Sequence, residues 1–366
     1  MTAFLRNTFL AAFAGIGAAA CAADSAAGPQ EDFNIVFTGQ SLIEHDPRTY
    51  IDAPSQSVRP YLQGADVAFT NLEVAVSNPE CDCRPTRDDV YFHGVGPETV
   101  PYLADMGFTL MSLSNNHAWD FGANGILSTI EVVESLGVAH AGTGVDLEAA
   151  AAPGFLKAGG RTVALVSVAT TNLPADAAAT ADRPGVNVLN PGDEIAWART
   201  MSAIRAADAA ADIVIVYQHF QVSDHEEFQV AFARAAVDAG ADVYVSHGEP
   251  TLAGVESYGD GVIFYDLGNF LFHSKAKLGR YTPDVWESVL ADVSFDADGV
   301  RDVTFTPVIL NEVGVEPHPL PTRGQPEVAT GEAGVGILKR LQAMSGGSAD
   351  IVIEGEKARL VLKTEE

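Results

Sequence analysis

Short apolar runs recur along the chain and alternate with stretches in which apolar residues repeat at helical spacing. Several runs are continuously apolar, which is typical of strands covered on both faces. They lie at residues 33–39, 65–73, 107–114, 161–169, 211–219, 241–247 and 261–269. Amphipathic helices are expected between them, at 122–137, 193–210 and 224–240. This alternation of strands and helices predicts an α/β architecture.

The chain is long enough for one large domain or two small ones, with 366 residues of which 47% are apolar. Two stretches, 170–193 and 314–334, are expected to be long loops. Neither has the composition of a flexible linker between independent domains, and no internal repeat is present. We therefore expect one domain, from about residue 31 to residue 366.

The first 20 residues have the features of an export signal. Arg6 precedes an apolar run from Thr8 to Ala20, and small residues follow up to Cys21. Cleavage before Cys21 with acylation of its thiol would give a membrane-anchored lipoprotein, whereas ordinary cleavage nearby would give a periplasmic protein. No other apolar stretch approaches the ~20 residues that a bilayer-spanning helix needs.

Charge limits the classes of partner. With 49 acidic and 21 basic residues the formal net charge is −28, which argues against nucleic-acid binding. A polyanionic substrate would need a bound cation or a local basic pocket. Cys81 and Cys83 form either a local disulfide or a surface-loop feature, and we assign them no catalytic role.

Polar side chains stand where the predicted strands end. Ligands of open α/β sheets bind beyond the carboxyl ends of the strands, so a shared pocket is expected at these positions. The residues are Gln40, Asn71, Glu73, Asn115, Asn116, His117, His219, His247 and Glu249.

The segments around these strand ends resemble the CapA family, which is named for poly-γ-glutamate capsule biosynthesis, within the calcineurin-like metallophosphatase superfamily. The similar segments are residues 65–73, 113–144, 237–247 and 255–272. The resemblance implies a metallophosphatase-like α-β-β-α sandwich, in which two facing mixed sheets are flanked by helices. It also implies a metal site at the strand ends.

The resemblance implies a reduced metal site. Gln40 follows Gly39 where the family has Asp, and Pro250 stands where the family has a second His. Both lost ligands would serve the same ion of a two-metal site. The ligands that the family uses for the other ion are all present in this sequence: Glu73, Asn116, His219 and His247. These donors suit one divalent ion of the Zn or Mn type, although a site without metal stays open. Gln40 and Glu249 are candidates to replace the missing ligands.

Two further residues match the family and carry proposed roles. The resemblance implies that His117 acts as a general acid, since imidazole transfers protons near neutral pH. Asp120 either orients His117 or caps the following helix. Five other histidines receive no role: His93, His140, His225, His273 and His318.

Three functions are consistent with this pattern. The first is an exported, metal-assisted hydrolase or transferase of the capsule biosynthesis type, acting on an anionic polymer or a small molecule. The second is a non-catalytic accessory protein for export or retention of an anionic polymer. The third is a metal-free acid/base enzyme, for example an epimerase. Metal analysis separates the first function from the other two.

Overall fold

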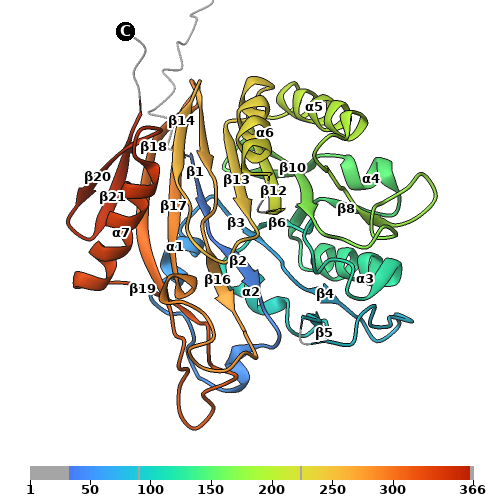
Figure 1. Cartoon of the computed structure of the whole chain (residues 1–366), viewed down its shortest axis with the longest axis horizontal. Helices are drawn as coiled ribbons and strands as arrows, with labels where there is room; N and C mark the ends of the chain where they lie inside the picture. The colour runs from blue at the N-terminus through green and yellow to red at the C-terminus, as the bar shows by residue number, and fades with distance from the viewer. Residues whose placement is uncertain (1–32, 90, 223–224, 363–366) are drawn as a thin grey trace, which may run out of the picture. The chain divides into compact units, whose positions relative to one another are not determined.

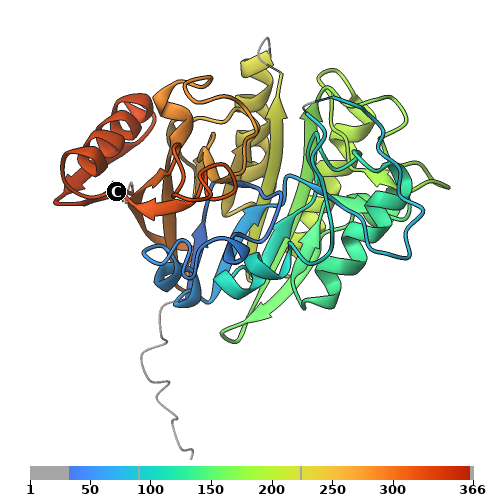
Figure 2. The same cartoon turned by 90° about the horizontal axis from the view of Figure 1, so that it is seen from below.

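Two large β-sheets lie face to face in the computed structural model, which describes residues 33–89, 91–222 and 225–362 (Figures 1 and 2). The nine-stranded sheet has the order β20-β21-β18-β17-β1-β3-β6-β7, with β19 paired to β18. Its strands are β1 (Phe33–Phe37), β3 (Val67–Asn71), β6 (Leu110–Ser112), β7 (Ala139–Ala141), β17 (Glu287–Phe295), β18 (Val300–Leu310), β19 (Pro326–Val328), β20 (Asp350–Glu354) and β21 (Lys357–Val361).

The six-stranded sheet has the order β14-β15-β13-β12-β10-β9. Its strands are β9 (Gly154–Ala158), β10 (Arg161–Thr171), β12 (Ile213–Gln221), β13 (Val243–His247), β14 (Val255–Tyr258) and β15 (Gly261–Phe264). Three short pairs complete the strands of the described residues: β2 (Gln40–Leu42) with β16 (Asn269–Phe272), β4 (Ala75–Val76) with β5 (Gly94–Val95), and β8 (Thr143–Gly144) with β11 (Gly185–Val186).

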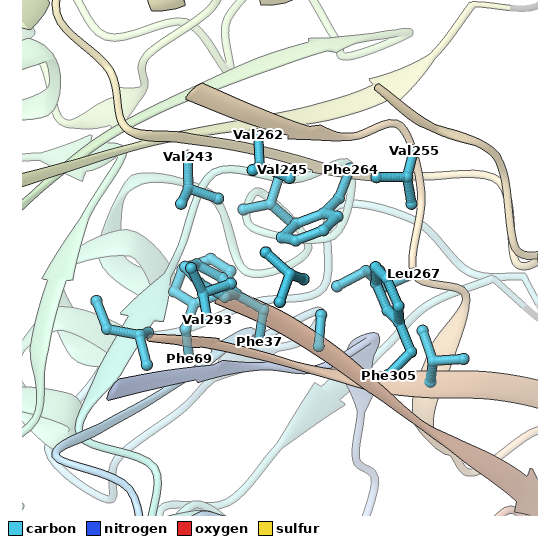
Figure 3. Packing of buried hydrophobic residues seen from close by; sticks show 14 of the residues in the cluster. Phe37, Phe69, Val243, Val245, Val255, Val262, Phe264, Leu267, Val293 and Phe305 are labelled. Carbon is cyan, nitrogen blue, oxygen red and sulfur yellow. The ribbon is translucent and has the colours of Figure 1, made fainter. Parts of the chain in front are cut away.

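The space between the two large sheets is filled by apolar side chains. In β1 alternate residues, including Ile35 and Phe37, point into this layer, while Val36 points to the opposite face. Phe37 meets Phe69 of β3 and Phe264 of β15, with ring centroids 5.7 and 5.9 Å apart. Figure 3 shows this layer, with Val243, Val245 and Phe264 facing the strands that carry Phe37 and Phe69.

Helices cover the outer faces of both sheets, which explains why the strands are apolar on both sides. Helices α5 (Glu194–Asp208) and α6 (Glu226–Asp238) pack on the six-stranded sheet through residues such as Ile204 and Phe232. Helices α1 (Arg59–Gln63), α2 (Pro101–Met106) and α3 (Gly122–Ser135) cover the parallel half of the nine-stranded sheet. The predicted α-β-β-α sandwich is confirmed.

Among the described residues, two further helices and the two 3-10 turns named below lie outside these layers. Helix α7 (Gly331–Ser345) inserts Ile337, Leu338 and Leu341 into the core between the sheets, beside β18 and β20 (Figure 1). Helix α4 (Leu147–Ala151) packs against β8. The 3-10 turns are Pro47–Thr49 and Pro283–Trp286.

The structure differs from the sequence prediction in several places. The single strand predicted at 261–269 is divided: β15 ends at Phe264, the chain turns at Gly268, where φ is 73° and the backbone N–H donates to Asp266 Oδ1 at 2.7 Å, and β16 begins at Asn269. The loop predicted at 170–193 contains the short strand β11, and the loop predicted at 314–334 contains β19 and the start of α7.

The predicted export signal, residues 1–20, and Cys21 lie outside the described residues, while Asp32–Glu366 forms one compact unit. Across the part of the chain that the structure describes, no helix has both the length and the apolar character needed to cross a bilayer. Cys81 and Cys83 form a disulfide in the loop between β4 and β5.

Candidate functional site

A cavity of about 700 Å³ opens where the parallel strands of both sheets end. The nine-stranded sheet contributes parallel β1, β3 and β6, and the six-stranded sheet contributes parallel β12 and β13. The residues that follow or close these strands line the cavity: Gln40, Glu73, Asn116, His117, Gln221, Gly248 and Pro250. The predicted pocket is therefore lined by residues from the strand ends of both sheets.

Short backbone contacts fix the loops that carry these side chains. Glu73 N donates to Ser41 O at 3.0 Å, which ties the end of β3 to β2. A Cβ on Gly39 would lie 2.4 Å from Gly268 O, so only glycine allows these two loops to approach. Asn115 Nδ2 donates to Asn71 Oδ1 at 3.1 Å and joins the ends of β3 and β6.

His219 and His247 lie directly opposite one another on neighbouring parallel strands, and both are fully buried. Tyr217 Oη lies 3.3 Å from His219 Nδ1, which orients that ring. His219 Nε2 is 4.0 Å from Glu73 Oε1, so a residue of the six-stranded sheet meets a residue of the nine-stranded sheet. Three of the four predicted metal ligands are thus brought into one region.

Several buried polar atoms of this region have no hydrogen-bond partner among the described residues. They are Glu73 Oε2, Asn116 Oδ1, His219 Nε2, both ring nitrogens of His247, and Gln40 Oε1. An unpartnered buried polar atom destabilises a protein by about 1–3 kcal/mol, so a cluster of them points to a ligand. Two imidazoles, a carboxylate and an amide oxygen are suitable donors for a divalent cation.

The side chains are not closed around one point. Among the described residues, no group of three or more His, Cys, Asp or Glu side chains is arranged to hold a metal ion as it stands. The donor atoms are of a kind that binds a cation, but their side chains would have to move closer together to bind one. Glu249, a candidate replacement ligand, is exposed and does not line the cavity. The metal site stays a prediction.

Burial controls the protonation of these donors. Burial, reinforced by the nearby Asp120 charge, raises the pKa of Glu73 to about 8. Burial also lowers the pKa of His247 to about 3 and the pKa of His219 well below its ordinary value. Both imidazoles are therefore neutral at physiological pH, which is the form that binds metal.

His117 is held by Asp120. His117 Nδ1 donates to Asp120 Oδ2 at 3.0 Å, because a carboxylate only accepts, and Arg87 pairs with Asp120 Oδ1 at 2.9 Å. Asn116 Nδ2 donates to His117 Nε2 at 3.2 Å. Burial lowers the pKa of His117, and the hydrogen bond to Asp120 opposes that shift. Helix α3 begins at Gly122 after Phe121, so Asp120 does not cap it.

The cavity also contains residues that the sequence analysis passed over. His93 lies beside His117, and Lys277 and Arg280 line the opening with Lys275. His93 precedes the two-residue strand β5, which no hydrophobic pattern marks. The three basic residues belong to the segment after β16, whose position depends on the pairing of β16 with β2. Sequence periodicity does not reveal either contact.

The fold and the residues at the strand ends define a metallophosphatase-like α/β sandwich. The chain belongs to the family described as bacterial capsule synthesis protein PGA_cap, whose model matches residues 34–274. It is 30% identical over 240 residues to the capsule biosynthesis protein CapA of Bacillus anthracis, covering 65% of this chain and 58% of that protein. The chain therefore spans less than two thirds of that relative.

Two other relatives and one solved structure are similar. The PGA biosynthesis protein CapA of Bacillus subtilis is 29% identical over 270 residues, covering 73% of this chain and 67% of that protein. A probable polyglutamine synthesis accessory protein of Mycobacterium tuberculosis is 30% identical over 213 residues, covering 56% and 55%. A hypothetical protein from Thermus thermophilus matches at a TM-score of 0.45 with 14% identity, over 75% of this chain and 98% of that chain.

The raised pKa of Glu73 predicts a pH-dependent stability for protein treated with a chelator. The folded protein holds a proton on Glu73 that the unfolded chain releases, so stability falls as pH rises from about 4.5 to about 8. One such proton contributes a slope of about −1.4 kcal/mol per pH unit. Burial also raises the pKa of Asp242 and Asp266, which contribute to the same dependence. Denaturant titrations across this range should therefore show that Glu73→Gln makes the slope less negative by about 1.4 kcal/mol per pH unit.

Glu80→Gln is the control, since Glu80 is exposed outside the cavity, and it should keep the slope of the parent protein. If Glu73→Gln and the parent protein show the same pH dependence, Glu73 is ionised in the folded protein and the prediction is wrong.

Proposed function

We propose that this protein is a hydrolase or transferase of the capsule and poly-γ-glutamate biosynthesis type, with one divalent metal ion at most. The observation that carries the proposal is the position of the His117–Asp120 pair. It borders the same cavity as the unpartnered donor atoms of Glu73 and Asn116, and the buried imidazoles of His219 and His247 lie in the same region. A proton-transfer group beside a cation site is the arrangement that hydrolytic and transfer reactions use.

The proposed metal would be held by Glu73, Asn116, His219 and His247. When bound, such an ion polarises the scissile group and makes a bound water more acidic. Asp120 keeps the hydrogen of His117 on Nδ1, so His117 Nε2 is the atom that exchanges a proton with the substrate. Arg87, paired with the other oxygen of Asp120, keeps that carboxylate in place.

Two substituted positions favour a single ion. Two dications ~3.5–4 Å apart repel strongly and need anionic ligands between and around them. Gln40 is neutral, and its Nε2 already donates to Asn269 Oδ1 at 3.2 Å. Pro250 has no side-chain donor atom. The second ion would therefore lack both a carboxylate and an imidazole.

Metal analysis of purified protein by inductively coupled plasma mass spectrometry tests this proposal. We expect at most one Zn or Mn per chain, and loss of that ion in His247→Ala. The double variant Gln40→Asp with Pro250→His should raise the content towards two. His140→Ala removes a histidine outside the cavity and should change nothing. Two tightly bound ions in the parent protein would contradict the proposal.

The basic residues at the opening support an anionic substrate, either a polymer or a small molecule. Lys275 pairs with Glu44 at 3.0 Å and Arg87 with Asp120 at 2.9 Å, while Lys277 and Arg280 have no ion-pair partner among the described residues. In a chain of net charge −28, this local positive charge is what an anion would need to approach.

The double variant Lys277→Ala with Arg280→Ala should weaken binding of poly-γ-glutamate. Removing two contacts of about 0.5–1 kcal/mol each corresponds to a roughly 5–30-fold rise in Kd. Calorimetric or fluorescence titration at low and moderate salt would measure it. Arg205→Ala with Lys339→Ala makes the same charge change away from the cavity and is the control. Equal losses in both double variants would mean that only net charge matters.

A non-catalytic accessory role is the second candidate. The Mycobacterium tuberculosis relative carries the word accessory in its name, and Gln40 and Pro250 replace two ligands of the family's site. The accessory role requires polymer binding without turnover. In that case His117→Gln would leave polymer binding unchanged, and no polymer shortening or transfer product would form with the parent protein. Turnover lost in His117→Gln would favour the enzyme.

We also propose that the protein is exported and that Cys21 carries a lipid anchor. The support is the sequence of residues 1–21, in which an apolar run precedes a cysteine flanked by small residues. Cys21→Ser should then move the protein from the membrane fraction to the soluble extracytoplasmic fraction, as measured by immunoblotting. If parent and variant are both recovered in the soluble fraction, the protein is exported without an anchor.

A further inference from the structure

A second imidazole in the cavity is held by a carboxylate. His93 Nδ1 lies 2.8 Å from Glu44 Oε1, and the same oxygen accepts from Lys275 Nζ at 3.0 Å. Burial acts to raise the pKa of Glu44, but the hydrogen bonds from His93 and Lys275 outweigh it and lower that pKa. Because the ionised carboxylate can only accept, the hydrogen of His93 sits on Nδ1.

His93 and His117 both form a hydrogen bond with Asp120. Asp120 Oδ2 accepts from the His93 backbone N–H at 2.8 Å and from His117 Nδ1 at 3.0 Å. The two rings meet edge to face, with centroids 4.4 Å apart and an interplanar angle of 79°. Each ring therefore has a carboxylate at Nδ1, and the two are held at a defined separation and angle.

The other nitrogen of His93 is available. His93 Nε2 forms no hydrogen bond with another described residue, and it is not among the buried unpartnered atoms, so it has accessible surface. His93 lines the cavity together with His117. An imidazole with a free Nε2 that faces a cavity is placed to accept a proton from a bound hydroxyl or water.

We propose that His93 is a second catalytic proton-transfer residue, that Glu44 is its positioning residue, and that His93 and His117 act as a base and acid pair. The inference rests on the proposed function and extends it to an acyl or phosphoryl substrate. Such transfers need one proton removed from the nucleophile and one delivered to the leaving group.

The step is balanced with these two residues. The attacking O–H bond breaks and its proton goes to His93 Nε2, while the oxygen bonds to the carbonyl carbon or phosphorus. His117 enters the step as an imidazolium, whose Nε2–H takes the place of the hydrogen bond from Asn116 Nδ2. The bond to the leaving group then breaks, its electron pair stays with the leaving atom, and that atom takes the proton from His117 Nε2. Two adjacent imidazolium ions repel, which favours the state in which only one ring is charged. Proton exchange with solvent restores the starting state.

Carbethoxylation with diethyl pyrocarbonate tests the assignment without any substrate. His140 is the matched comparison, because it is similarly accessible, at 15% against 11% for His93, and also pairs with a carboxylate. However, its Nε2 faces Glu134 and its Nδ1 is buried. At pH 7, peptide mass spectrometry should show His93 modified at least about tenfold faster than His140, since only His93 offers a free ring nitrogen.

Glu44→Gln should slow the modification of His93 about threefold or more, because an amide can also donate to Nδ1 and so no longer keeps the hydrogen of the ring on Nδ1 and Nε2 free. Glu134→Gln, the equivalent change at His140, should leave the His93 rate unchanged, and circular dichroism would verify that both variants are folded. Modification of His93 no faster than that of His140, or a His93 rate unaffected by Glu44→Gln, overturns the proposal.

Kinetics with bis(p-nitrophenyl) phosphate supply the catalytic readout. His93→Gln should lower kcat about 10²-fold or more with little change in KM, and imidazole in the buffer should partly rescue His93→Ala. His140→Ala should retain full activity. A His93→Gln enzyme with unchanged kcat would overturn the assignment. If the parent protein turns over neither this ester nor a polymer, the proposed function is wrong. The carbethoxylation rates would still show whether His93 Nε2 is free to react.

Discussion

The apolar layer between the two sheets determines where every polar strand end lies. Phe37, Phe69 and Phe264 pack within this layer, so β1, β3 and β15 are held in fixed register across it. Parallel strands that share such a layer must all end at one edge. Burial of apolar surface, at roughly 25 cal/mol per Å², stabilises an arrangement that forces His219 against Glu73 at 4.0 Å. The core therefore supplies the free energy that keeps unpartnered polar atoms together.

The resulting cavity differs electrostatically from the rest of the protein. The chain as a whole is strongly acidic, but its cavity is lined by the protonatable carboxyl of Glu73 and by Lys277 and Arg280, which have no ion-pair partner among the described residues. The neutral imidazoles of His219 and His247 are fully buried in the same region. Asp120 is central, because it orients His117, holds the His93 backbone and pairs with Arg87. A cation bound beside Glu73 would contact the unpartnered donor atoms, and an anionic substrate at the opening would pair with Lys277 and Arg280.

The parts of this structure that follow from local patterns were predictable. Continuous apolar runs identify β1, β3, β12 and β13, and the polar residue after each run identifies the cavity edge. The turn at Gly268 and helix α7 were not predictable. Gly268 interrupts an apolar run, and α7 begins inside residues 314–334, a stretch whose proline and glycine content is typical of a loop. His93, Glu44 and Lys277 reach the cavity only through long-range pairing of two- to four-residue strands, which leaves no periodic signal.

The ends of both sheets are proposed to form one site that holds a single cation at most. Anomalous diffraction from crystals grown with Mn²⁺ would test this directly, because it locates each ion without reference to activity. We expect no more than one anomalous peak, within bonding distance of Glu73, Asn116, His219 and His247. Two peaks in the cavity, or a single peak held by other residues, would contradict the proposal.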